Sequence, residues 1–145
     1  MTAPTIHASA VLVGPRAVLI RGPSGAGKSR LAFALIQTSG LPFARLVGDD
    51  RVHVEAIHGH LLVRPAETLA GLIEVRGLGL RRLPYEPVAV VGLVADLETP
   101  DAERLPEPTT VTTLAGLDLP RLCAAPGADA LGMLIAALRT ADSGH

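Results

Sequence analysis

The chain has 145 residues, which leaves room for a single core and none for a separate substrate domain, so we expect one domain over residues 1–145. With 48% apolar residues, 19% charged residues and a net charge of −1, it has the composition of a globular protein without the basic surplus of a nucleic-acid binder. Only 2% of the residues are aromatic, which argues against a platform for stacking nucleic-acid bases.

Cysteine content and hydropathy bear on the compartment in which the protein works. The single cysteine, Cys123, cannot form an internal disulfide and is too few for a cysteine-based zinc site. No apolar run reaches the length of a membrane span, and the first residues lack the pattern of an export signal. We therefore expect a cytoplasmic protein without a membrane segment.

Apolar runs and turn residues predict the order of the elements along the chain. Runs of β-branched and apolar residues bounded by Gly or Pro indicate strands. Apolar residues at helical spacing indicate helices, as in KSRLAFALIQTSG. The predicted strands are residues 10–13, 17–20, 46–48, 52–57, 58–63, 72–76, 88–95 and 117–123, and the predicted helices are residues 28–40 and 129–139.

The connections and one strand carry further expectations. The pair 52–57 and 58–63 is predicted to form a hairpin that turns near His58-Gly59. Residues 77–87 are predicted to be a loop, and the Pro-rich and acidic segment 98–108 an exposed loop. Because residues 88–95 are nearly all apolar, we expect a central, buried strand there.

The stretch RGPSGAGKS contains the pattern G-x-x-x-x-G-K-[ST], which is typical of a phosphate-binding loop, or P-loop. Its glycines let backbone N–H groups turn inward around phosphate oxygens. Lys28 would reach the β and γ phosphates, Ser29 would offer a hydroxyl to Mg²⁺, and the following helix adds its positive dipole end. The motif therefore predicts a bound nucleotide and Mg²⁺. The predicted nucleotide-binding residues are Gly22, Pro23, Ser24, Gly25, Ala26, Gly27, Lys28 and Ser29.

Four segments in a fixed order carry a resemblance to a known family: IHASAVLV, GPSGAGKS, LVGDDRVHV and LIEVRGLGL. Over residues 6–139 the chain resembles the C-terminal catalytic domain of HPr kinase/phosphorylase, in a form without the family's N-terminal domain. The resemblance implies an α/β P-loop kinase domain related to phosphoenolpyruvate carboxykinase, with a mixed sheet and flanking helices. It also implies an ATP-dependent serine kinase of HPr, or of a paralogous phosphocarrier, that regulates the phosphotransferase system and assembles as a hexamer.

The resemblance assigns catalytic roles to a histidine and two aspartates. His7 matches the family's active-site histidine, which pairs with a neighbouring aspartate. Asp50 matches the proton acceptor in phosphorylation and the donor in the reverse step, which leaves Asp49 to interact with His7 or the metal. Adjacent residues of an extended strand point to opposite faces, so only one of the two acids can face the acceptor hydroxyl. From the residues alone, a solvated acidic turn or an ordinary metal-binding acid is the alternative.

Further roles follow for a glutamate and two arginines. Glu74 and Arg76 match the family's signature segment, in which the glutamate helps to hold Mg²⁺ together with Ser29. The pattern E-V-R alone is equally typical of an exposed strand face. Arg104 corresponds to an active-site arginine in a loop, where a guanidinium would neutralise charge on the transferring phosphoryl group. An exposed arginine without a role is the alternative for Arg104.

Full-length members of the family also remove the phosphate by phosphorolysis, and a late loop with two arginines is associated with that reaction. Ala125 and Ala128 stand at the corresponding positions here, so an incoming phosphate would lose two positive partners. We therefore expect a domain biased towards the kinase direction. Two other function classes stay open at this point, a P-loop kinase of small metabolites and a nucleotide-sensing module without turnover.

Overall fold

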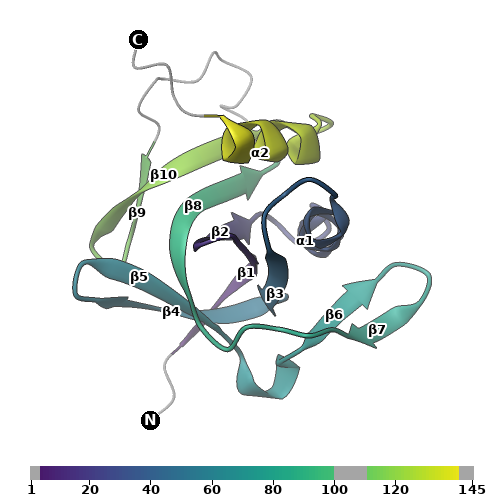
Figure 1. The fold of residues 1–145 in the computed structure, drawn as a ribbon, viewed down its shortest axis with the longest axis horizontal. Coiled ribbons are helices and arrows are strands. Elements are labelled where there is room, and N and C mark those ends of the chain that lie inside the picture. Colours follow the sequence, from purple (N-terminus) through teal and green to yellow (C-terminus); the bar gives the residue numbers. More distant parts are fainter. Residues whose placement is uncertain (1–3, 100–110, 141–145) are drawn as a thin grey trace.

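The fold is mixed α/β and consists mostly of strands (Figure 1). A computed structural model describes residues 4–99 and 111–140. The strands of these residues are β1 (Thr5–Val13), β2 (Arg16–Arg21), β3 (Ala44–Gly48), β4 (Arg51–Ile57), β5 (His60–Pro65), β6 (Leu72–Val75), β7 (Gly79–Arg82), β8 (Ala89–Leu97), β9 (Val111–Leu114) and β10 (Leu117–Ala124). The helices are α1 (Lys28–Gln37), the short 3-10 helix η1 (Glu67–Leu69) and α2 (Ala130–Arg139).

The main sheet closes on itself as a small barrel. Its strand order is β2-β1-β4-β5-β8-β10-β9. An additional pairing of β2 with β8 closes the first five of these strands into a ring. β3 pairs with β1 beside this ring, and β6 and β7 form a separate two-stranded sheet. A mixed sheet with flanking helices was expected, whereas the closure was not, because it depends on pairing between strands far apart in the sequence.

Three neighbouring strands are parallel, and this places their ends together. β2 pairs in parallel with β8, and β8 pairs in parallel with β10. In the register, Arg21 lies beside Asp96, and Asp96 lies beside Cys123. The carboxyl ends of the three strands therefore meet at one edge of the sheet, which is where ligands bind in many α/β folds.

Alternate residues of the central strands fill two separate cores. Ala17 and Leu19 of β2 belong to the core inside the barrel, whereas Val18 and Ile20 belong to the core beneath the helices. This alternation is the period of two that a strand imposes on its side chains. Small residues are frequent inside the barrel, as a narrow barrel requires. The small buried residues there are Ala8, Ala10, Ala17 and Ala89.

Both helices lie on the same side of the sheet and cover the second core (Figure 1). α1 contributes Leu31 and Leu35, and α2 contributes Leu134, all of them buried. The predicted helices at 28–40 and 129–139 correspond to α1 and α2. No helix of the described segments has the length and hydropathy that a membrane-spanning helix needs.

One predicted loop contains a strand, and one strand was not predicted. The predicted loop 77–87 contains β7, which pairs with β6 by backbone hydrogen bonds although its four residues are exposed. β9 was not predicted and pairs with β10 around the turn at Ala115-Gly116. The predicted hairpin turn at His58-Gly59 is confirmed, and so is the central position of β8, between β5, β2 and β10. Most of the predicted loop 98–108 lies outside the described residues.

A buried ion network ties the three parallel strands together just before the P-loop. Asp96 of β8 is 6% exposed and accepts hydrogen bonds from Arg21 Nε at 2.7 Å and Arg21 Nη2 at 2.8 Å. It also accepts one from Arg121 Nε of β10 at 2.5 Å. Burial alone would raise the pKa of Asp96, but the hydrogen bonds and charges of the two arginines outweigh burial and hold this pKa below its ordinary value.

We expect Asp96→Asn to lower the free energy of unfolding by about 2–4 kcal/mol at neutral pH, because it removes the buried negative charge that two partly buried guanidinium groups face. A lowered pKa in the folded state stabilises the fold above the unfolded value of about 3.9, and this stabilisation is lost as the pH falls through the folded value. The difference between parent and variant should therefore shrink at acid pH. Urea unfolding at neutral pH and at acid pH measures both effects.

The exposed carboxylate of Asp118 on β10 provides the matched control, since it accepts a hydrogen bond from the Thr113 hydroxyl and lies outside the network. Asp118→Asn should change the free energy of unfolding by less than about 0.5 kcal/mol. Equal effects of the two substitutions would contradict this account of the network. A loss of unfolding free energy in Asp96→Asn that does not depend on pH would contradict it as well.

Candidate active site

The P-loop connects the end of β2 to the start of α1 and has the backbone that phosphate binding requires. Gly25 and Gly27 have φ values of 84° and 94°, and a Cβ atom built on either would meet nothing within 4 Å. Gly27 is the N-cap of α1, and no side chain caps this helix or places an acid in its first turn. The first N–H groups of a helix have no partner within the helix, so this end fits an anion.

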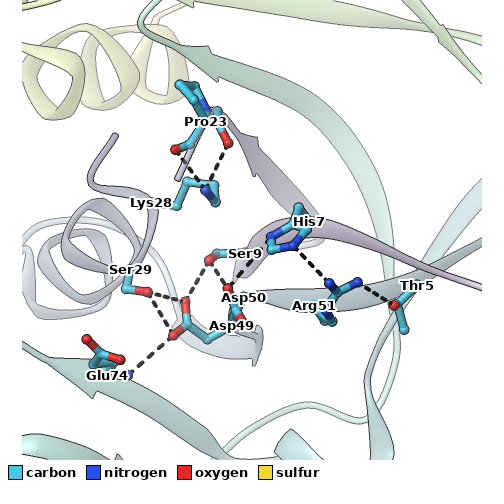
Figure 2. A network of polar contacts seen from close by, with 11 residues as sticks. Thr5, His7, Ser9, Pro23, Lys28, Ser29, Asp49, Asp50, Arg51 and Glu74 are labelled. Carbon is cyan, nitrogen blue, oxygen red and sulfur yellow. Dashed lines mark hydrogen bonds and ion pairs between the residues drawn. The ribbon is translucent and has the colours of Figure 1, made fainter. Parts of the chain in front are cut away.

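Lys28, the only lysine of the chain, lies folded over the P-loop. The residue is 8% exposed, and its ammonium donates hydrogen bonds to the carbonyl oxygens of Gly22 at 2.8 Å and Pro23 at 3.1 Å. Figure 2 shows its amino group pointing back to Pro23 at the start of the loop. The two carbonyls compensate the burial of this charge and hold it at the cleft that the P-loop lines.

Asp49 joins three segments of the chain through its buried carboxylate. It is 4% exposed and accepts a hydrogen bond from Ser9 Oγ of β1 at 2.6 Å. Ser29 Oγ of α1 lies 2.8 Å from both carboxylate oxygens, and the backbone N–H of Glu74 in β6 donates to Oδ2 at 3.3 Å (Figure 2). Because Ser29 has one proton and gives it to Asp49, the lone pairs of its oxygen are left for another partner.

Asp50 lies at the surface of the same turn, beside His7. The backbone of Asp50 has φ 69°, and its side chain is 62% exposed. His7 Nδ1 is 3.8 Å from Asp50 Oδ1, and His7 Nε2 is 2.9 Å from Arg51 Nη2 (Figure 2). A guanidinium only donates, so Nε2 accepts and the ring proton is assigned to Nδ1, on the side of Asp50.

The positions of the two aspartates correct the argument from strand alternation. β3 ends at Gly48 and β4 begins at Arg51, so neither acid is part of a strand. They point in different directions because Asp50 adopts a left-handed backbone in the turn. The sequence left two partners open for Asp49, His7 and the metal. The Asp49 carboxylate contacts Ser29, a residue of the predicted metal site, whereas His7 lies beside Asp50.

Glu74 and Arg76 complete the cleft. Glu74 lies on β6, and Arg76 directly follows this strand; both are exposed. Among the described residues no three His, Cys, Asp or Glu residues are grouped to hold a metal ion, so a cation here would need Ser29, Glu74 and phosphate oxygens together. Arg104 lies outside the described residues. One cleft of about 1010 Å³ is lined by His7, Ser24, Gly25, Ala26, Gly27, Lys28, Ser29, Asp49, Asp50, Glu74 and Arg76, together with neighbouring residues.

Two residues of the polar network were not predicted. Ser9 is fully buried in β1 and accepts a hydrogen bond from the backbone N–H of Asp50 at 3.4 Å while its hydroxyl donates to Asp49. Its signal in the sequence is a single hydroxyl inside the apolar run HASAVLV. The other is Arg51, which contacts His7 through its guanidinium. Arg51 directly follows the two acids in the sequence, and nothing in this neighbourhood indicates a contact with His7.

Comparisons with known proteins agree on one family. The family model described as "HPr Serine kinase C-terminal domain" matches residues 2–83. A protein named HPr kinase/phosphorylase from Clostridium beijerinckii is 41% identical over 75 residues, which are 52% of this chain and 24% of the relative. A protein of the same name from Streptococcus thermophilus is 43% identical over 77 residues, again 52% of this chain and 24% of the relative. The matched segment thus spans about a quarter of these relatives' own length.

A solved structure shows that the likeness in fold extends further than the likeness in sequence. The Hpr(Ser) kinase/phosphatase from Coxiella burnetii superposes with a TM-score of 0.75 and covers 94% of this chain and 88% of that chain. The two sequences are 24% identical, so this comparison concerns the fold alone.

We expect Lys28→Ala to weaken ATP binding by about 10-fold or more, because one charge-assisted contact to a phosphate contributes about 1.5–3 kcal/mol. Calorimetric titration with Mg-ATP measures the dissociation constant. Arg64→Ala on β5 is the control: this exposed cation pairs with Glu55 and does not line the cleft. Unchanged ATP affinity in Lys28→Ala would show that the loop does not hold the nucleotide.

Proposed function

The chain belongs to the HPr serine kinase C-terminal domain family, and from that premise we propose that it is an ATP-dependent protein kinase which phosphorylates a serine of HPr or of a paralogous phosphocarrier. The observation that carries the proposal is the position of Asp50. This carboxylate lies exposed beside His7 and lines the same cleft as Lys28 and Ser29. A phosphate donor on the P-loop and a base for the acceptor hydroxyl thus share one space.

The P-loop and the start of α1 would hold the phosphates of ATP, with Lys28 as the positive partner of the β and γ groups. Ser29 and Glu74 would hold Mg²⁺, and the hydrogen bond of Ser29 to Asp49 leaves the serine lone pairs available for the ion. The ion would supply positive charge against the charge that develops on the transferring phosphoryl group. Arg76, which also lines the cleft, would add a second positive charge for these oxygens.

Transfer would begin when the acceptor serine approaches the turn of β3 and β4. The hydroxyl proton moves to the Asp50 carboxylate, the serine oxygen forms a bond to the γ-phosphorus, and the bond between that phosphorus and the β–γ bridging oxygen breaks. ADP leaves with the electron pair of that bond. His7, whose Nδ1 lies 3.8 Å from Asp50 Oδ1, would help to keep the Asp50 carboxylate in place, and Arg51 would keep the ring in this orientation.

The exposure of Asp50 favours a protein acceptor over a small metabolite. Its side chain is 62% exposed and that of His7 is 56% exposed, so the base lies at an open surface. An enzyme for a small acceptor encloses most of its substrate surface in a pocket. A protein carries its acceptor serine on a large surface, which can cover the open end of the cleft.

The late loop between β10 and α2 supports the expected bias towards the kinase direction. Ala125 and Ala128 bring no charge to this loop, and the Asp129 carboxylate is engaged in capping α2 through the N–H of Gly132 at 2.9 Å. Phosphorolysis needs positive partners for a second, inorganic phosphate. The described part of this loop offers none, and weak phosphorolysis therefore remains part of the proposal.

We expect Asp50→Asn to bind Mg-ATP like the parent and to phosphorylate HPr at least about 100-fold more slowly than the parent, as for the loss of a general base. The experiment incubates the chain with Mg-ATP and purified HPr and follows acid-stable phosphoserine by mass spectrometry. Asp118→Asn, an exposed acid on β10, is the control and should retain the parent rate.

The same experiment separates the three classes of function. Rapid phosphoserine formation by the parent supports the protein kinase. ATP turnover without phosphoserine would favour a metabolite kinase, and binding without turnover would favour a nucleotide sensor. Equal rates for parent and Asp50→Asn would remove Asp50 from the mechanism.

A further inference from the structure

A second cavity of about 320 Å³ adjoins the cleft at the carboxyl ends of the parallel strands. It lies between the start of α1, the end of β8 and the loop that joins β10 to α2. It includes none of His7, Asp49, Asp50 or Glu74, so it is separate from the end of the cleft where transfer would occur. Five residues line both spaces: Ala26, Gly27, Arg30, Ala34 and Glu98.

The lining of this cavity is small and mostly apolar. Alanine and glycine predominate, with Leu31, Leu97 and Leu131 at the apolar wall. Three charged residues contribute to it, and one of them, Asp129, uses its carboxylate to cap α2. The other two are Arg30 and Glu98, both at the junction with the cleft. A flat apolar group with polar atoms at one end fits such a space.

The backbone of Glu98 is an independent sign of function at this junction. Four residues other than glycine have positive φ values in the described part of the chain. His58 and Ala115 precede a glycine in a hairpin turn, where this conformation is common. Asp50 and Glu98, with φ values of 69° and 56°, both line the cleft instead. Strained backbone of this kind gathers at binding and catalytic sites.

We propose that this cavity holds the nucleoside of the phosphate donor and that the Glu98 carboxylate accepts hydrogen bonds from the ribose hydroxyls. The inference rests on the proposed function, since it takes the P-loop as the site of the phosphates. A carboxylate accepts hydrogen bonds and phosphate oxygens do the same, so the partners of Glu98 are the donor groups of the nucleoside. The base then lies against Ala34 and the loop 125–129, and the triphosphate extends along the P-loop towards Asp50.

A bulky side chain in the cavity tests the location of the nucleoside. Ala128 is exposed and lines the cavity, so Ala128→Trp adds an indole there without disturbing a buried position. Ala56 on β4 is also exposed and lines neither space, so Ala56→Trp is the matched control. The dissociation constants of Mg-ATP and of Mg-tripolyphosphate are measured by calorimetry for both variants and the parent.

We expect Ala128→Trp to weaken Mg-ATP binding by about 10-fold or more and to leave Mg-tripolyphosphate binding within about 2-fold of the parent. Ala56→Trp should change neither. An unchanged affinity for ATP in Ala128→Trp overturns the inference, and so does an equal loss for ATP and tripolyphosphate. If the parent binds neither ligand, the P-loop assignment fails, and with it the proposed function.

The role of Glu98 is tested by Glu98→Gln with two nucleotides. This variant should bind Mg-ATP about 5- to 10-fold more weakly than the parent, because a neutral amide is a poorer acceptor than a carboxylate. The penalty should disappear with 2′,3′-dideoxyATP, which lacks both ribose hydroxyls. An equal loss of affinity for both nucleotides, or no loss for either, would show that Glu98 does not contact the ribose.

Discussion

The buried carboxylate of Asp49 is the constraint on which the arrangement of the site depends. It accepts hydrogen bonds from Ser9 of β1, from Ser29 of α1 and from the backbone N–H of Glu74 in β6. A buried carboxylate without such donors is unfavourable by several kcal/mol. These three segments are distant in sequence and meet at this carboxylate. The P-loop serine and the Glu74 strand are thereby fixed next to the turn that carries Asp50.

The closed sheet supplies the rigid frame for this arrangement. Parallel pairing of β2, β8 and β10 brings three strand ends to one edge, and each end continues into a part of the site. The P-loop follows β2, Glu98 follows β8, and the loop 125–129 follows β10. The Asp96 ion network locks the same strands one residue before the P-loop begins. Rigid strands beneath short loops give the positional accuracy that phosphoryl transfer requires.

Sequence patterns predicted the elements that depend on interactions between neighbouring residues. The P-loop, the two helices and the turn at His58-Gly59 follow from glycine positions and apolar spacing, and the structure places them as predicted. β7 escaped prediction because all four of its residues are exposed, so only backbone pairing with β6 defines it. The barrel closure escaped because a pairing of β2 with β8 leaves no mark in either strand's own sequence.

In the candidate site, too, some residues could be predicted from the sequence and others could not. The order of the matching segments was sufficient to select His7, Asp49, Asp50 and Glu74, and the structure brings all four to one cleft. Strand alternation gave the wrong reason for the divergence of the two aspartates, because β3 ends before them. Ser9 was missed because a serine in an apolar strand indicates a buried partner without saying which one.

The Mg²⁺ dependence of ATP binding by Asp49→Asn tests most directly whether Asp49 organises the site. An asparagine has the same shape, but its NH₂ group cannot accept, so it disturbs the hold on Ser29. The account predicts that the Mg²⁺ concentration for half-maximal ATP binding rises about 10-fold or more, as for other residues that orient a metal ligand. ATP binding without Mg²⁺ should stay close to that of the parent. The same Mg²⁺ dependence in the folded variant and the parent would contradict the account.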